Sequence, residues 1–350
     1  MVSTACRPGG IDVTLAGMRD QTFQDFEVIL VDRRYERRHT EVVELANNWG
    51  VPVLHVPEHR RNGKWVSFAS AWNTGFALAR GRTVIILVDY AYAPPKWIEN
   101  HLEALGEGLR YVVAPYHVLP LPDLEPKCDY DFIGVYREWK KSFSCSEENA
   151  VGRGEVLDEM RVFRKGWFDP SWLSELLSKQ AEGELGVDDR IKAWSQVRDA
   201  GLPEGWVHIK NESIARDFLW ELNGVDERLE RGRGPIDIDF QWRLVTGGAE
   251  MVWCPKATVF YLDPHVLLPA LPFGSTLERV SGRWSWRDGL SYVSHRRAEM
   301  SFGRSPAAKN SYTLKQLSER LSSWRDGDVP VPRDVSDMEY WGRELLPESI

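Results

Sequence analysis

The sequence predicts an α/β fold, in which helices flank a mostly parallel β-sheet. Over the first 120 residues, apolar runs of strand length alternate with segments whose apolar residues recur at helical spacing. Strands and helices in that order form parallel sheets with right-handed crossovers. A second indication is the short apolar run at residues 83–88 (TVIILV), which is typical of a strand buried on both faces.

The helix at residues 64–80 is the clearest of the expected elements. Phe68, Trp72 and Phe76 recur on one of its faces at helical spacing. Gly50 follows another expected helix and suits the left-handed position past a helix end. Strands are expected at residues 2–6, 26–31, 51–56, 83–88 and 111–118, and helices at residues 11–20, 40–49, 64–80 and 97–105.

The strand at residues 83–88 delivers Asp89 to the carboxyl edge of the sheet, where open α/β sheets bind their ligands. The alternative is that Asp89 only caps the helix that begins near Pro95. The choice between the two depends on whether other polar residues reach the same edge.

The alternation of strands and helices breaks after residue 120. Glycines and prolines interrupt polar, aromatic-rich segments up to about residue 205, with helices expected around residues 171–181 and 188–200. We interpret this stretch as an insertion that shapes the acceptor side of a cleft. Regular patterns return at residues 208–225 and 236–261, and a polar region with a helix at residues 313–324 follows. That region could pack on the core, cap an oligomer or contact an acceptor.

The composition is that of a globular protein, with 43% hydrophobic and 27% charged residues. The net charge of -8 and the pI near 5.6 argue mildly against nucleic acid or an anionic membrane as a partner. The four cysteines include no C-x-x-C pair, so reduced thiols are expected. We find no signal peptide and no apolar run of roughly 18 residues, which predicts a soluble, cytoplasmic protein.

Four further segments follow one another in order along the chain. They are residues 21–32 (QTFQDFEVILVD), residues 62–64 (NGK) with 71–75 (AWNTG), Asp89, and residues 223–227 (NGVDE) with 236–243 (IDIDFQWR). By their order and spacing, more than by any one of them, these segments resemble the family 2 glycosyltransferases of the GT-A fold. The resemblance implies a Rossmann-like GT-A catalytic domain at residues 1–265, with the insertion at about 120–205, and a helical C-terminal extension at residues 266–350.

The resemblance implies a donor site at the first three segments. Asp32 corresponds to the carboxylate that hydrogen-bonds the base of a sugar nucleotide. Lys64 and Asn73 lie in the segments beside the nucleotide diphosphate. Both also have a simpler structural interpretation, as polar residues of a helix start and a helix face.

The fourth segment carries the expected catalytic base. Asp237 takes that position in the resemblance, and Asp239 is the less favoured alternative. The structural interpretation is that both are acids near a helix start, where the macrodipole favours negative charge.

The metal-binding motif departs from the family pattern. Asp89 stands for the first acid of Asp-x-Asp, but Ala91 replaces the second, an ordinary ligand of Mg²⁺ or Mn²⁺. Asp89 can hold such a cation together with water, and His265 is a candidate further ligand, although an ordinary loop histidine is the simpler account. The arginine-rich residues 33–38 replace the family's Asp-Asp-Gly-Ser and could meet phosphate instead.

The predicted function is that of an inverting, hexosyltransferase-like glycosyltransferase with a UDP- or GDP-sugar donor. Such a transfer needs a group that binds the nucleotide base, a positive charge that neutralises the diphosphate, and a carboxylate that deprotonates the acceptor hydroxyl. Asp32, Lys64 and Asp237 could fill these roles in turn. Two alternatives stay open. One is a nucleotidyltransferase, for which residues 7–10 (RPGG) make only a weak glycine-rich loop; the other, suggested by Ala91, is a non-catalytic protein that binds nucleotide sugars or carbohydrate.

Overall fold

The structure is a computed structural model of the chain, and it describes residues 1–5, 11–32, 35–59, 68–89, 91–120, 211–227, 235–263 and 307–329. The predicted insertion lies outside these residues from residue 121 to residue 205. No helix in the described ranges combines the length and the apolar character needed to cross a membrane.

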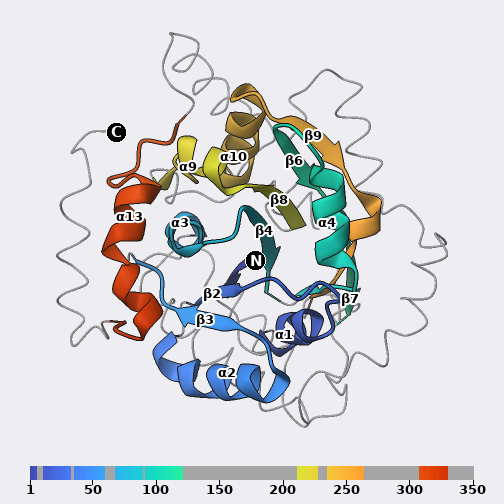
Figure 1. The fold of residues 1–350 in the computed structure, drawn as a ribbon, viewed down its shortest axis with the longest axis vertical. Helices are drawn as coiled ribbons and strands as arrows, with labels where there is room; N and C mark the ends of the chain where they lie inside the picture. The colour runs from blue at the N-terminus through green and yellow to red at the C-terminus, as the bar shows by residue number, and fades with distance from the viewer. Residues whose placement is uncertain are drawn as a thin grey trace, which may run out of the picture.

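A seven-stranded sheet forms the centre of the described structure, with the strand order β3-β2-β1-β4-β8-β6-β9 (Figure 1). Strand β8 is antiparallel to both of its neighbours, and the other pairs are parallel. The predicted α/β fold with a mostly parallel sheet is therefore confirmed. The strands are β1 (Val2–Ala5), β2 (Val28–Asp32), β3 (Val53–Val56), β4 (Thr83–Val88), β6 (Arg110–Val113), β8 (Asn211–Ala215) and β9 (Glu250–Trp253).

A smaller sheet contains β5 (Ala91–Tyr92), β7 (Tyr116–Pro120) and β10 (Val259–Asp263) in the order β5-β10-β7. The single strand expected at residues 111–118 is wrong, because the chain leaves β6 at Ala114 and enters β7 in the other sheet. Pro115 has no N–H to donate to a ladder, so a strand cannot continue through it undisturbed. The Ala114 N–H instead bonds the Asn211 carbonyl at 3.0 Å.

Helices cover both faces of the main sheet, which explains the buried apolar runs of β2 and β4. One buried cluster joins α1, α2 and α4 to the sheet, and another joins α3, α9, α10 and α13 to the opposite face (Figure 1). All five residues of β2 are buried, as this arrangement requires. The helices are α1 (Ile11–Arg19), α2 (Tyr35–Trp49), α3 (Phe68–Leu78), α4 (Trp97–Leu105), α9 (Arg216–Glu221), α10 (Pro235–Thr246) and α13 (Leu314–Arg320).

Helix α3 lies directly on β1 because Gly75 has no side chain. A Cβ atom at this position would lie 2.2 Å from Cγ1 of Val2, far inside van der Waals contact. The glycine in the 71–75 segment is therefore required by close packing, and it brings the helix with Asn73 against the central strand.

The C-terminal residues 307–329 pack on α3 and belong to the same core. Leu314, Leu317 and Trp324 are buried in the cluster that contains α3. Thr313 caps α13 in a capping box with Gln316, close to the predicted helix start. The 3₁₀ helix η4 (Ser322–Asp326) follows, so the expected helix at residues 313–324 is confirmed as α13 continued by η4.

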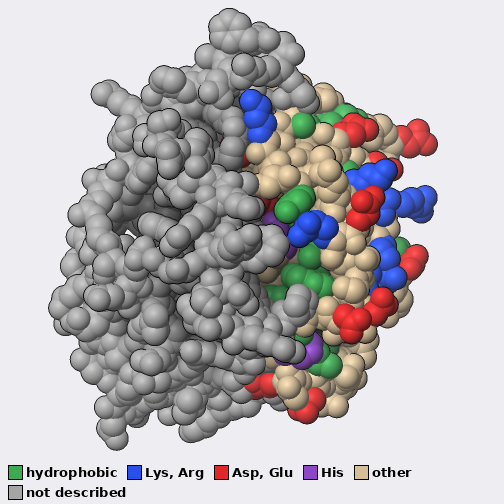
Figure 2. Space-filling view, turned by 90° about the vertical axis from the view of Figure 1, so that its left-hand side faces the viewer, with side chains coloured by type: hydrophobic (Ala, Val, Ile, Leu, Met, Phe, Trp, Pro, Cys, Tyr) green, Lys and Arg blue, Asp and Glu red, His purple; other side chains and the backbone are tan. Residues whose placement is uncertain are grey.

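The described surface carries acidic and basic side chains in a mixed distribution. Figure 2 shows red and blue side chains interspersed along the described part of one face. Leu109 is the exposed large hydrophobic residue among the described ones, at 37%. This surface therefore presents neither a dominant basic field nor a broad apolar patch on the face shown.

Candidate functional site at the carboxyl edge of the sheet

The structure brings Asp32 and Asp89 to the same edge of the sheet, on either side of β1. Asp32 is paired in register with Ala5, the last residue of β1. On the other side of β1, Val88 is paired with Thr4, and Asp89 is the next residue of the chain. Parallel strands end at one edge, so both residues lie at the edge where ligands of α/β sheets bind.

Asp89 does not serve as the cap of helix α4. That helix has Lys96 as its N-cap residue, with no side-chain cap hydrogen bond. Asp89 is 4% exposed at the end of β4. The capping alternative is therefore ruled out, and the placement of Asp89 at the ligand edge stands.

Asp32 is paired with a histidine. Oδ2 of Asp32 lies 3.0 Å from Nε2 of His55 in β3, and both side chains are fully buried. Nδ1 of His55 in turn lies 3.1 Å from Nδ1 of His39 in α2. If Asp32 is a carboxylate, His55 donates to it from Nε2.

The two histidines are stacked, and Tyr35 packs against both rings. The ring centroids of His39 and His55 are 5.1 Å apart with an interplanar angle of 11°. Tyr35 lies 4.5 Å from His39 and 5.1 Å from His55. Burial, and to a lesser extent the neighbouring His55, lower the pKa of His39. The rings of Tyr35, His39 and His55 therefore pack as one cluster beside Asp32.

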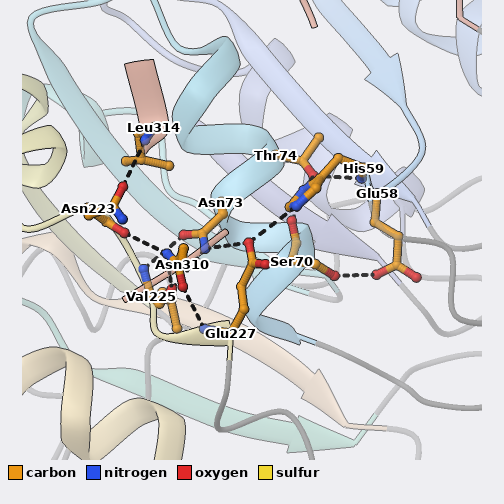
Figure 3. A network of polar contacts seen from close by, with 10 residues as sticks. All are labelled: Glu58, His59, Ser70, Asn73, Thr74, Asn223, Val225, Glu227, Asn310 and Leu314. Atoms are coloured by element: carbon orange, nitrogen blue, oxygen red, sulfur yellow. Dashed lines mark hydrogen bonds and ion pairs between the residues drawn. The ribbon is translucent and has the colours of Figure 1, made fainter. Parts of the chain in front are cut away.

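Asn73 is fully buried in α3 and holds the loop of residues 223–227, here called the 223–227 loop. Its Nδ2 donates to the carbonyl of Val225 at 2.8 Å and to Oε1 of Glu227 at 2.9 Å, and its Oδ1 accepts from the Val225 N–H at 2.8 Å. The described contacts of Asn73 thus join the second and fourth sequence segments (Figure 3).

His59 links α3 to the 223–227 loop (Figure 3). Thr74 Oγ1 donates to the Ser70 carbonyl at 2.7 Å, so it accepts from the N–H and Nδ1 of His59, at 2.9 and 2.8 Å. Nε2 of His59 lies 3.3 Å from Oε1 of Glu227, which also accepts from Asn73. His59 and Glu227 therefore form a buried contact beside Asn73.

Helix α10 carries both candidate base residues, and the structure describes the side chain of Asp239. Asp239 is 2% exposed, and its Oδ2 accepts from Nε of Arg243 at 2.8 Å. Nη1 of Arg243 donates to the Leu222 carbonyl at 3.1 Å, so this pair ties α10 to the residue before the 223–227 loop. Asp237 lies in the first turn of α10. The described contacts of Asp239 are therefore those of a structural ion pair.

The described residues do not assemble a metal site. Ala91 is fully buried in β5 opposite Tyr261 of β10 and offers no ligand atom. Across the described ranges, no three His, Cys, Asp or Glu side chains are grouped to hold a metal ion. Asp89 is thus a single carboxylate at the place where the family motif has two acids.

A protein-family model described as glycosyl transferase family 2 matches residues 3–160. The resemblance to family 2 glycosyltransferases found in the sequence is thereby confirmed for these residues. Together with the mixed sheet of Figure 1, the match confirms the GT-A fold class predicted from the sequence. The sequence matches no curated protein.

Solved structures that are similar to the chain share little sequence with it. TarS 1-349 of S. aureus in complex with UDP is 10% identical, with a TM-score of 0.42 over 75% of this chain and 60% of that one. GalNAc-T7 with UDP, GalNAc and Mn²⁺ is 14% identical, with a TM-score of 0.44 over 94% of this chain and 56% of that one. The chain therefore covers less than two thirds of either protein.

Two of the predicted site residues, Lys64 and His265, lie outside the described residues. The sequence analysis missed His39, His55 and His59. A signal existed for His55, a polar residue inside an expected strand next to the strand that ends in Asp32. No local signal marks Asn310, which bonds the 223–227 loop from a segment more than 80 residues downstream.

Proposed function

We propose that the chain is an inverting glycosyltransferase that transfers a sugar from a UDP- or GDP-linked donor to an acceptor hydroxyl. The observation that carries the proposal is the placement of Asp32 and Asp89 on either side of β1. This edge lies in a segment that matches glycosyl transferase family 2, and it is the ligand edge of an α/β sheet.

The donor is proposed to bind across β1. Asp32, oriented by His55, accepts a hydrogen bond from an N–H of the base. Asp89 faces the diphosphate from the end of β4, and Lys64, outside the described residues, is proposed to neutralise it. Asn73 acts indirectly, because its amide holds the 223–227 loop against α3.

The chemical step is proposed to be a single displacement at the anomeric carbon. The acceptor oxygen forms a bond to that carbon while the bond to the diphosphate oxygen breaks, and the electron pair leaves with the nucleoside diphosphate. The acceptor proton passes to the carboxylate of Asp237. Asp239 is the weaker candidate, because its Oδ2 is engaged by Arg243 in a buried pair. Attack from the face opposite the leaving group inverts the configuration.

A Mn²⁺ or Mg²⁺ ion is implied by the family resemblance, but the described residues do not fit one well. Asp89 supplies one carboxylate, and Ala91 supplies none. A weakly bound ion on Asp89 and His265 stays a prediction, and no step above depends on it. The cytoplasmic location likewise stays a prediction of the sequence.

The test is to measure nucleotide binding and sugar transfer separately. Asp237→Asn should lose about 10²–10⁴ in turnover, the usual contribution of a positioned base, while nucleotide affinity stays unchanged. Asp217→Asn is a matched control, because Asp217 lies in the short helix α9 with its side chain 86% exposed. Normal transfer by Asp237→Asn would remove Asp237 as the base. Transfer in excess chelator would show that cationic side chains neutralise the diphosphate.

The second candidate function is a non-catalytic protein that binds nucleotide sugars, and Ala91 is the observation that favours it. Such a protein would bind UDP or GDP but would neither transfer nor hydrolyse any sugar of a donor panel, with or without Mn²⁺. Calorimetry with both nucleotides and a product assay on the same preparation separate the two candidates.

A further inference from the structure

The 223–227 loop has a backbone conformation that needs support from outside the loop. Asn223 and Gly224 both have positive φ angles, of 59° and 65°. A left-handed conformation costs a non-glycine residue roughly 1–2 kcal/mol. At Gly224 a Cβ atom would lie 2.3 Å from Oδ1 of Asn73, so the loop also lies too close to α3 for a side chain.

One side of this loop is held by α3 and the other by the C-terminal segment. Asn310 uses its whole side-chain amide on the loop backbone (Figure 3). Its Oδ1 accepts from the Glu227 N–H at 2.9 Å, and its Nδ2 donates to the carbonyls of Asn223 and Val225 at 2.8 and 2.9 Å. The loop therefore depends on a residue that lies 83 positions after Glu227 in the sequence.

The 223–227 loop in turn makes hydrogen bonds to the C-terminal segment. Nδ2 of Asn223 donates to the Ala308 carbonyl at 2.9 Å, and its Oδ1 accepts from the Leu314 N–H at 2.8 Å, in the first turn of α13. The Ala308 N–H bonds the Leu222 carbonyl at 2.8 Å. These reciprocal bonds fix Asn223 in its left-handed conformation, because both side-chain groups are used.

The segment that presents Asn310 is itself anchored on the catalytic core. Leu314 and Leu317 are buried against α3. Beyond them, Arg325 bonds both carboxylate oxygens of Glu27 and the Leu78 carbonyl at the end of α3. The chain is thus held before Asn310, at Ala308, and after it, at Leu314. This arrangement suits a residue that must hold a loop in one position.

We propose that Asn310 is a positioning residue of the transfer site, which makes residues 307–314 part of the catalytic unit. The inference rests on the proposed function, because the loop matters to transfer only if it leads to a base on α10. Asn310 holds the 223–227 loop from the C-terminal segment, and Asn73 holds it from α3. The Asp239–Arg243 pair bonds Leu222, the residue just before this loop.

The experiment compares three variants in the full-length chain. Asn310→Ala removes all three bonds to the loop. Asn310→Asp keeps the acceptor for the Glu227 N–H but loses both donations. Lys309→Ala is the matched control, because Lys309 is the exposed neighbour in the same segment. For each protein, hydrogen exchange of the loop amides, nucleotide Kd, and kcat and KM for transfer are measured.

The expected result for Asn310→Ala is exchange at the loop amides at least 10-fold faster, from the loss of hydrogen bonds that each contribute modestly. We expect kcat to fall at least 10-fold while the nucleotide Kd changes less than 3-fold. Asn310→Asp should fall between this variant and the wild type, and Lys309→Ala should match the wild type.

Unchanged loop exchange in a folded Asn310→Ala protein would overturn the positioning role. Faster loop exchange with unchanged kcat would overturn its link to transfer. A wild-type protein that binds nucleotide but transfers no sugar would instead refute the proposed function, and the exchange data would still show whether Asn310 holds the loop. If Asn310→Ala does not fold, loop hydrogen exchange and kcat are measured for Asn310→Asp instead, and the same outcomes overturn the proposal.

Discussion

His101 in α4 should make the folded state less stable as the pH falls. Its Nε2 donates to Oδ1 of Asn211 at 2.9 Å, and its Nδ1 accepts from Oγ of Ser213 at 3.0 Å. The orientation of the Asn211 amide is set by its donations to the carbonyls of Pro115 and Ala257, both at 2.8 Å. Both ring nitrogens are therefore occupied as in a neutral imidazole.

Burial lowers the pKa of His101 from 6.5 to about 4, and the hydrogen bond to Asn211 offsets only part of this effect. Between these two pH values the unfolded chain binds a proton that the folded protein does not bind. The unfolding free energy is therefore unaffected by this proton above pH 6.5. It decreases as the pH falls below 6.5, and it stops decreasing below the folded-state pKa. The difference between the folded-state and unfolded-state pKa values corresponds to about 3 kcal/mol of unfolding free energy.

The assay is urea unfolding followed by tryptophan fluorescence, for the wild type and His101→Gln, between pH 7.5 and pH 4.5. The glutamine keeps hydrogen-bonding groups but does not titrate. The wild type should be more stable at pH 7.5, by about 1–3 kcal/mol for the buried polar contacts, and this advantage should shrink by most of the 3 kcal/mol at pH 4.5. An advantage that is the same at both pH values would refute a neutral, buried His101.

Two further predictions concern the donor site and the packing beneath it. Asp32→Ala should weaken nucleotide binding by about 1.5–3 kcal/mol, the range for a hydrogen bond to a charged group, as measured by calorimetry. Unchanged affinity in a folded variant would remove Asp32 from the base site. Gly75→Ala should lower the unfolding free energy by about 1–3 kcal/mol, because its new Cβ atom would overlap Cγ1 of Val2. An equally stable Gly75→Ala protein in urea would show that α3 can move away from β1 without cost.

The sequence alone determined the fold class and the placement of two carboxylates. Alternating apolar runs are a local property of the chain, and they located β2 and β4 to within a few residues. Because each apolar run ends on a carboxylate, the sequence predicted Asp32 and Asp89 at strand ends, and the strand pairing confirms one shared edge. Helix α13 was likewise recognisable from its own residues, including the Thr313 cap.

Tertiary structure decided which groups those residues contact. The pairing of Asp32 with His55, the pairing of Asp239 with Arg243, and the bonds from Asn310 to the 223–227 loop bury polar groups against partners. Two of these three pairings join separate elements, and a buried polar group must find a partner wherever the fold provides one. The break of the expected strand at Pro115 has the same origin, because only the assembled sheets show that the chain changes from one to the other there. Local periodicity records whether a residue faces the core but not which distant residue it meets, so the site's edge was predictable and its network was not.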